Sequence, residues 1–439
     1  MPKPGLFREF LRYTALNVLG MLALSCYILA DTCFIAQKLG PDGLTSLNLA
    51  IPVFNVISGT ALMLAMGGGA RFMLRKSTGD TQQGDAVFTH TILLAALFSG
   101  LLMLTGAFLS APLTRLLGAD ADTYAMTHTY LRTLLLCAPL FLYNSVLQSF
   151  VRNDGAPQLA MGAMIAGSLS NIVLDLLFLY VFRMGMFGAV LATCIAPGIS
   201  LTVLLPYFLR GKNSFSPVHV RVPDMQALHI MAVGASSLIS EVASGAVIVT
   251  FNLLMLHFAG NTGVAAYGII ANLSLVVIAV FSGIAQGTQP LLSRSFGQGQ
   301  MQDTVRLRRY MAVSILLVFA LLELLLFPCA GAVAGAFNRE GDPALQGLAV
   351  QGLHLYFLGA GFAGLNIAGA VQLAAAEQPG KSTLISGLRG FVLMLPLSFC
   401  MAMLWQVPGL WLSFPVTEAL TLCIWQMLTR LPKKSGQIL

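Results

Sequence analysis

Two stretches of the chain decide the fold: GARFMLRKSTGDTQQGD at residues 69–85 and GTQPLLSRSFGQGQMQD at residues 287–303. They carry two glycines and a final aspartate at the same offsets, 218 positions apart. A second pattern, an asparagine 13 residues before a proline, occurs at residues 144–157 and again at 366–379, shifted by 222. Such repetition predicts two tandem structural units. Because long apolar segments surround both copies, we expect paired membrane bundles, an arrangement typical of secondary transporters.

Composition indicates that most of the surface faces lipid. Of the 439 residues, 57% are hydrophobic and only 9% are charged, whereas soluble proteins carry about 25% charged residues. Apolar runs of about 20 residues cross a bilayer as α-helices, which satisfy their own backbone hydrogen bonds there. We therefore predict an all-α integral membrane protein with twelve transmembrane helices in two pseudo-symmetric bundles of six. The predicted spans are 13–36, 44–69, 86–109, 124–150, 159–182, 187–209, 228–257, 265–290, 309–333, 348–373, 383–404 and 409–430.

The distribution of basic residues predicts the topology. With twelve spans, both termini lie on one side of the membrane. Eighteen of the 24 lysines and arginines fall at the termini or in the loops on that side, five fall in the opposite loops, and Arg389 lies within a span. By the positive-inside rule, both termini are cytoplasmic, and we expect a multi-pass protein of the cell (inner) membrane. The net charge of +7 therefore reflects topology, and we expect no nucleic-acid partner because the basic residues form no single stripe.

A polar connection divides the two units. Residues 211–223 contain Gly211, Pro217 and Pro223 among polar residues, a composition typical of a linker. We predict an N-lobe at 1–210 with spans one to six, a cytoplasmic linker at 211–223, and a C-lobe at 224–439 with spans seven to twelve.

Acidic residues at membrane depth are costly, so each is a candidate functional residue. Asn171 and Asp175 are four residues apart and share a helix face. At 1.5 Å per residue, Asp175 lies about 24 Å and Asp31 about 27 Å from the inner ends of their spans, and Thr193 lies about 9 Å below the outer surface. These four residues are thus expected at similar depth. Their oxygens are suited either to a small cation such as Na⁺ or to one proton shared by two carboxylates.

The second unit lacks this set. Shifted by 222, Asn171 and Asp175 fall on Leu393 and Leu397, and Asp31 falls among residues 249–252. The asymmetry predicts that only the N-lobe binds the coupling cation.

The C-lobe has its own charged residues within spans. Glu241 and Glu418 lie near the middle of spans seven and twelve, and Asn252 lies further along span seven. We expect these three to line the substrate cavity, where Glu241 attracts a cationic substrate. Arg389 is either the internal counter-charge of Glu418 or extends toward the cytoplasm, and its position favours the second. Glu323 is a weaker candidate in an apolar run.

Four segments resemble the MATE family, the multidrug and toxic compound extrusion transporters. The stretch YILADTCFIAQKLG at 27–40 is similar to the signature of the family's first span, and LAIP at 49–52 to the start of its second span. The stretch GIAQGTQPLLSRSFG at 283–297 resembles the eighth-span signature, and NIVLD at 171–175 resembles the fifth-span motif of the prokaryotic branch with an N-lobe cation site.

This resemblance implies two six-helix bundles arranged in a V around a central cavity. It also implies export of lipophilic, often cationic compounds, driven by the inward flow of H⁺ or Na⁺. The residues matched to the cation site are Asp31, Asn171, Asp175 and Thr193, with Tyr27 and Gln148 lining the same pocket. One departure concerns the first span, which has no proline between residues 13 and 36; the sequence therefore does not support a mechanism that bends this span at a proline.

We therefore expect a cation-coupled antiporter with small-molecule substrates and membrane lipids as partners, no cofactor besides the coupling ion, and a monomeric state. The alternative is a flippase for lipid-linked saccharides or another amphiphile of the same superfamily. A membrane enzyme is disfavoured because no catalytic motif with nucleophile or metal-ligand spacing occurs. The substrate, and the choice between H⁺ and Na⁺, stay open at this level.

Overall fold

The computed structural model describes residues 5–220, 224–338 and 341–430, and throughout these ranges the regular structure is helical. The first half contains α1 Leu6–Ser77, α2 Thr81–Leu104, η1 Thr105–Leu109, α3 Ser110–Leu116, α4 Tyr124–Leu136, α5 Ala138–Asn153, α6 Pro157–Asp175, η2 Leu176–Val181 and α7 Gly185–Leu209. The second half contains α8 Met225–Gly297, α9 Met301–Phe337, α10 Pro343–Phe357, α11 Ala360–Ala375, α12 Pro379–Gly387, η3 Leu388–Val392 and α13 Met394–Arg430. The segments η1, η2 and η3 are π-helical turns.

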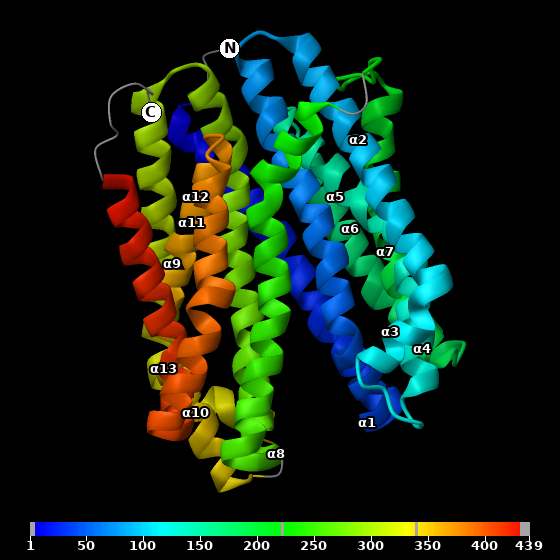
Figure 1. Ribbon diagram of the computed structural model, residues 1–439, viewed down its shortest axis with the longest axis vertical. Helices are drawn as coiled ribbons and strands as arrows, with labels where there is room; N and C mark the ends of the chain where they lie inside the picture. The colour runs from blue at the N-terminus through cyan, green and yellow to red at the C-terminus, as the bar shows by residue number, and fades with distance from the viewer. Residues whose placement is uncertain (1–4, 221–223, 339–340, 431–439) are drawn as a thin grey trace.

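Within the described residues, seven helical segments are long and apolar enough to cross a membrane, and two bent pairs, α4 with α5 and α10 with α11, bring the number to nine. Three of the seven contain a residue with non-helical backbone: Gly40 in α1, Gly260 in α8 and Gln406 in α13. At Gly40 and Gly260 the chain reverses direction, as the ribbon shows (Figure 1). Both have φ near +60 to +70°, which glycine adopts without strain. Divided at these three residues, the nine segments correspond to the twelve predicted spans.

The internal repeat is visible in the helix boundaries. Helices α5 and α11 begin at Ala138 and Ala360, and α6 and α12 begin at Pro157 and Pro379, so both pairs keep the shift of 222 found in the sequence. The bends that precede α5 and α11 measure 47° and 44°. Both α6 and α12 begin with a proline. Its missing backbone N–H is not a loss there, because the N–H at the first position of a helix has no acceptor within the helix. The two halves therefore repeat the same arrangement of helices.

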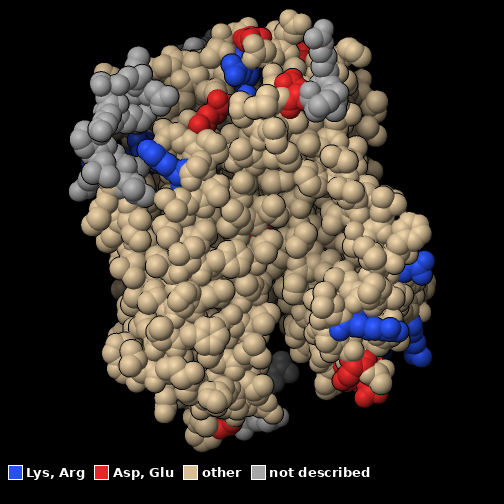
Figure 2. All heavy atoms as spheres, in the orientation of Figure 1, with Lys and Arg blue, Asp and Glu red and all other residues tan. Residues whose placement is uncertain are grey.

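The two halves stand side by side, with α2–α7 on one side and α8–α13 on the other, and both described chain ends lie at the same end of the molecule (Figure 1). Helix α1 begins against the second half, where Phe7 contacts Tyr310 of α9, and continues into the first half. Charged side chains on the visible face gather at the two ends, and the band between them is almost free of charge (Figure 2). This is the surface expected of a multi-pass membrane protein. The molecule is hollowed between the halves at the end opposite the termini, which gives the predicted V shape (Figure 2).

Two ion pairs close the other end, where the termini lie. Arg294 in the last turn of α8 donates two hydrogen bonds of 2.7 Å to the carboxylate of Glu9 in the first turn of α1. Arg71 in α1 lies 3.2 Å from Glu377, in the turn between α11 and α12. Both pairs join one half of the molecule to the other.

A buried hydrogen-bond chain continues this contact inward. The side chain of Asn17 donates to the backbone carbonyl of Gly283 at 3.0 Å and accepts from Arg152 at 2.7 Å. The sequence analysis counted Arg71 and Arg152 among the charges of the cytoplasmic side, and both are buried. Arg71 pairs with Glu377 of the second half, whereas Arg152 donates to Asn17 of the first.

Two glycines allow the helices of the two halves to cross with almost no space between their backbones. A Cβ atom on Gly67 would overlap the carbonyl oxygen of Ile230, and one on Gly234 would overlap that of Met63. These positions are closed to any larger residue unless the helices move apart.

The connection between the halves is packed against the first of them over the part that the structure describes. Phe215 is buried, with its ring centroid 4.6 Å from that of Phe88 and 5.4 Å from that of Phe72. The backbone N–H of Ser214 also donates to Asp154 at 2.9 Å. The predicted linker is thus anchored rather than free. Residues 1–4, 221–223 and 431–439, which belong to the predicted lobe and linker ranges, lie outside the described residues.

Candidate functional site

The structure brings the two predicted carboxylates of the first half together. Asp31 in the first part of α1 and Asp175 at the end of α6 lie within hydrogen-bonding reach of each other. Both are buried, with Asp175 completely inaccessible and Asp31 7% exposed. No ion pair formed by the described residues includes either of them. Two neighbouring carboxylates at such depth require a proton or a bound cation to offset their charge.

Asn171 and the backbone of Thr193 lie beside this pair of carboxylates. With its amide oriented to satisfy both neighbours, Asn171 donates to Asp175 Oδ2 at 3.0 Å and accepts from the backbone N–H of Thr193 at 3.2 Å. The side chain of Asn171 is fully buried, and Thr193 is nearly so. Asn171 therefore fixes the orientation of the Asp175 carboxylate from α6 and ties it to α7.

Each carboxylate keeps one oxygen without a partner. Oδ1 of Asp31 and Oδ1 of Asp175 are buried and accept no hydrogen bond from the described residues. A buried acceptor without a partner is costly and calls for an explanation. Here the explanation that fits the donor set is a small cation or a proton between these oxygens. The described residues contain no group of three or more histidine, cysteine or acidic side chains suited to a metal ion.

The local backbone at Asp175 is unusual. The α-helix α6 ends at Asp175, and the span continues as the π-helical turn η2. Single π-turns inside α-helices occur frequently at functional sites. The wider turn places Asp175 at a position where the helix changes its pitch.

Two tyrosines border the carboxylates. Tyr27 lies one helical turn before Asp31 and is close to both carboxylates. Tyr130 in α4 is buried and lies close to Asp31 and Thr193. Sequence reasoning missed Tyr130, since nothing in its position in span four distinguishes it from a packing residue.

Gln148 occupies a different place. Its side-chain N–H₂ donates to Asn144 at 2.9 Å and to Ser200 at 2.8 Å. The bond to Ser200 joins α5 to α7, the bond to Asn144 lies within α5, and neither involves the carboxylates. The assignment of Gln148 to the cation pocket stays a prediction without a contact to support it.

The second half contains a cavity of about 340 Å³, walled mainly by α8, α11, η3 and α13 and closed on one side by Leu62 and Met66 of α1. Its size falls in the range of small-molecule sites. Glu241 and Glu418 both line it, whereas Asn252 is not among its lining residues.

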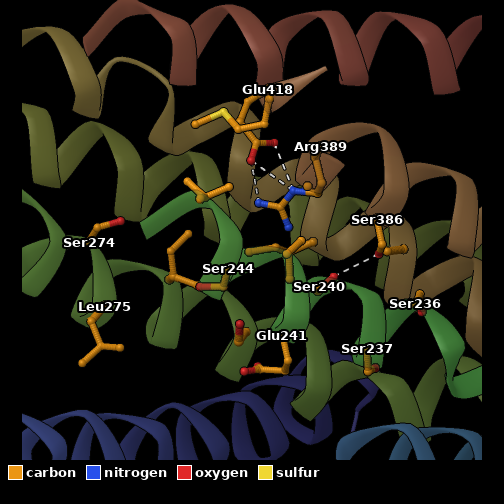
Figure 3. Close-up of a pocket in the computed structure, with 18 of the residues that line it drawn as sticks. Ser236, Ser237, Ser240, Glu241, Ser244, Ser274, Leu275, Ser386, Arg389 and Glu418 are labelled. Carbon is orange, nitrogen blue, oxygen red and sulfur yellow. Dashed lines mark hydrogen bonds and ion pairs between the residues drawn. The ribbon is translucent and has the colours of Figure 1, made fainter. Parts of the chain in front are cut away.

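Arg389 is the counter-charge of Glu418. Its Nη2 and Nε donate to Glu418 Oε1 at 2.6 and 3.0 Å (Figure 3). Asn366 donates to Oε2 at 2.7 Å. The interpretation favoured by the sequence, in which Arg389 extends toward the cytoplasm, was wrong. A guanidinium with a carboxylate within reach is stabilised more by pairing inside the protein than by extension to a distant interface.

Glu241 is different from Glu418 because it has no counter-charge. Its carboxylate forms no ion pair or hydrogen bond with the described residues, and it points into the cavity (Figure 3). Glu323, by contrast, is half-buried in α9 and lies near His354 of α10, away from this cavity.

Comparisons with known proteins agree with this architecture. The family model MatE matches residues 17–177 and 237–400. The multidrug export protein MepA of Staphylococcus saprophyticus is 25% identical over 426 residues, covering 96% of this chain and 92% of that protein. MepA of Staphylococcus aureus is 24% identical over 423 residues, covering 95% and 92%.

Two solved structures share the fold. An outward-facing multidrug resistance MATE family transporter of the MOP superfamily superposes with a TM-score of 0.90 at 21% identity, covering 98% of this chain and 96% of that one. A MOP superfamily transporter from Pyrococcus furiosus, described as having a binding pocket of reverse polarity, gives 0.89 at 21% identity with the same coverage.

The paired bundles, the hollow between them and the buried charges define a membrane transporter. The chain belongs to the MatE family of multidrug efflux transporters. Its relatives are transporters and not enzymes.

Proposed function

We propose that this protein is a secondary antiporter that exports lipophilic, cationic compounds in exchange for H⁺ or Na⁺. The observation that carries the proposal is the contact between Asp31 and Asp175, two buried carboxylates that each retain an oxygen without a partner. Glu241, which faces the cavity without a counter-charge, supports a cationic substrate. We infer that the protein works as a monomer surrounded by lipid in the cell (inner) membrane, with both termini cytoplasmic.

We infer the transport cycle from which end of the molecule is open and which is closed. With cytoplasmic termini, the hollow between the halves faces the outside and the two ion pairs close the inside. A cation that enters from outside binds between Asp31 and Asp175 and removes their repulsion. The packing of α1 against α6 and α7 then changes, and the halves reopen toward the cytoplasm. The cation leaves there and a new substrate enters the cavity.

Coupling requires that the cation stabilise one arrangement of the halves more than the other. The Asp31–Asp175 contact joins α1 to α6, and Asn171 extends it to α7. A cation at this point therefore changes the contacts among three helices of one half at once.

The test is drug/cation exchange in proteoliposomes that contain the variant Asp175→Asn. The pH gradient and the Na⁺ gradient are imposed separately, so that the same experiment identifies the ion. We expect the variant to insert into the membrane and to lose exchange, and the matched control Asp122→Asn, which changes an exposed loop aspartate, to keep it. Exchange at the wild-type rate in Asp175→Asn would refute the cation site.

The flippase alternative has less support from the cavity. An anionic lipid-linked headgroup needs several basic side chains, and the lining of this cavity includes one, Arg389, which is bound to Glu418. Expression in drug-sensitive cells, compared with rescue of an envelope-assembly defect, separates the two functions.

A further inference from the structure

Two cysteines that are far apart in the sequence meet inside the first half of the protein. Cys194 in α7 is buried, and Cys137, at the junction of α4 and α5, is half-buried. Both pack into the same hydrophobic core, and their thiols lie close to each other. The remaining cysteines of the chain are exposed: Cys26, Cys33, Cys329, Cys400 and Cys423.

One backbone carbonyl holds the two cysteines together. The carbonyl oxygen of Thr133 in α4 accepts a hydrogen bond from the backbone N–H of Cys137 at 3.0 Å. The same oxygen accepts the thiol of Cys194, whose sulfur lies 3.9 Å away. Because both bonds end on one oxygen atom, the sulfur of Cys194 is held beside the residue that carries the other thiol.

The place of Cys137 in the fold allows it to move. It is the last residue before α5 and lies at the bend of 47° between α4 and α5. Residues at the ends of helices absorb changes of backbone angle that a residue inside a helix cannot. The distance between the two sulfurs can therefore change without breaking a continuous helix.

Cys194 adjoins the candidate cation site. The backbone N–H of the preceding residue, Thr193, donates to Asn171 at 3.2 Å, and Asn171 donates to the carboxylate of Asp175. A movement of α7 at Cys194 therefore acts on the hydrogen bond that orients this carboxylate.

We propose that Cys137 and Cys194 form a site of reversible oxidation, at which a peroxide closes a disulfide and thereby slows transport. The half-buried Cys137 meets hydrogen peroxide first: its sulfur takes one oxygen atom and becomes a sulfenic acid, and one water is released. The sulfur of Cys194 then attacks the sulfenic sulfur. An S–S bond forms, the S–O bond breaks, and the hydroxyl leaves with the thiol proton as a second water.

The reaction balances with the peroxide as the oxidant. The two thiols together lose two electrons and two protons, and the peroxide is reduced to two molecules of water. A thiol reductant restores both cysteines by thiol–disulfide exchange.

The disulfide disturbs the cation site because the two sulfurs have to approach. Heavy atoms in non-bonded contact are about 4 Å apart, whereas the sulfurs of a disulfide are about 2 Å apart. The resulting pull on α7 acts beside Thr193. Its bond to Asn171 is already 3.2 Å long, which is the upper end of the range for an N–H···O hydrogen bond. This effect on transport rests on the proposed antiport, whereas the oxidation itself does not.

The first measurement is chemical and uses the purified full-length protein in detergent. After treatment with hydrogen peroxide, free thiols are blocked with N-ethylmaleimide, and the digested protein is analysed by mass spectrometry. We expect two peptides joined through Cys137 and Cys194, which separate after treatment with dithiothreitol. Peroxide-treated protein in which these two peptides stay separate overturns the proposal.

The second measurement is drug/cation exchange in proteoliposomes before and after treatment with hydrogen peroxide. In the wild type we expect exchange to fall by about tenfold, the effect of losing a hydrogen bond to a charged group, and to recover with dithiothreitol. Cys137→Ala cannot close the disulfide and should keep its exchange after peroxide. Cys194→Ala removes the other sulfur and should behave in the same way. The matched control Cys400→Ala, which removes an exposed cysteine, should respond to peroxide like the wild type.

Two results of the exchange assay contradict the proposal. An equal loss of exchange in Cys137→Ala places the damaging oxidation elsewhere, and joined peptides with unchanged exchange separate the thiol pair from the cation site. If the untreated wild type performs no exchange, the proposed antiport is refuted, and the mass spectrum alone decides whether these two cysteines are a site of oxidation.

Discussion

Arg294 and Glu9 form a bidentate ion pair, with both Nη atoms 2.7 Å from the two carboxylate oxygens, and it joins the end of α8 to the first turn of α1. The pair crosses from one half of the protein to the other at the end where the termini lie. It is partly exposed, at 30% for Arg294 and 21% for Glu9, so water screens it to some extent. Because this ion pair joins the two halves at the closed end, we call it the latch.

We expect Glu9→Gln to loosen this latch. A partly exposed ion pair contributes about 1 kcal/mol. Its loss shifts the equilibrium between the arrangement closed at the end of the termini and the arrangement open there by roughly fivefold toward the open one. The measurement is labelling, by a thiol reagent that cannot cross the membrane, of a single cysteine placed at Ser274 in a chain whose native cysteines have been replaced.

The exchange of both charges, Glu9→Arg with Arg294→Glu, serves as the control and should bring labelling back toward the wild-type rate. Labelling that is unchanged in Glu9→Gln would show that the pair contributes nothing to closure.

The glycine crossing gives a second prediction. Gly67→Ala places a methyl group against the carbonyl of Ile230, so the closed end cannot form without separation of the helices. We expect transport to fall by at least tenfold, because about 1.4 kcal/mol against one state already has that effect. Gly162→Ala in α6 is the matched control, since a Cβ there meets open space. Equal transport in the two variants would contradict the importance of the crossing.

The amide of Asn171 provides a third prediction. Asn171→Leu removes the hydrogen bonds to Asp175 and to the backbone of Thr193, which leaves a buried carboxylate without a fixed orientation. We expect cation-driven exchange in proteoliposomes to drop by about tenfold or more, the effect of removing a hydrogen bond to a charged group. The neighbouring Ser170→Ala removes a hydroxyl that bonds only to Gly167 of its own helix, and it should transport normally. Similar losses in both variants would point to general damage to α6.

The anchored connection predicts a stability effect. Phe215→Ala creates a cavity among the rings of Phe72, Phe88 and Phe150 and should cost about 3–5 kcal/mol, as for other buried phenylalanines. Thermal unfolding in detergent measures this. Phe108→Ala, at a position that is 76% exposed, should leave the transition nearly unchanged, and an equal shift for the two variants would exclude a packing role for Phe215.

Much of this architecture could be predicted from the sequence because its signals are local or periodic. Apolar length gives the spans, and the offsets between Asn144 and Pro157 and between Asn366 and Pro379 give the repeat. The meeting of Asp31 with Asp175 was also predictable, since helix rise sets the depth of each residue.

Contacts that depend on the angles between helices were not predictable in this way. Whether Arg389 reaches Glu418 or the membrane surface depends on how η3 faces α13, and spacing along the chain does not determine that. For the same reason the sequence assigned Arg71 and Arg152 to loops, although both are buried. Tyr130 was missed because a tyrosine that supports Thr193 has the same sequence pattern as one that packs in lipid.

The first part of α1, from Leu6 to the break at Gly40, has a continuous helical backbone and no proline after Leu6 until that break. Asp31 stands near one end of this rod and Glu9 near the other, about 33 Å apart at 1.5 Å per residue. A stiff rod hinged at a glycine acts as a lever. We therefore expect any displacement of Asp31 to be transmitted to Glu9 through the helix backbone, with no relay of side chains in between.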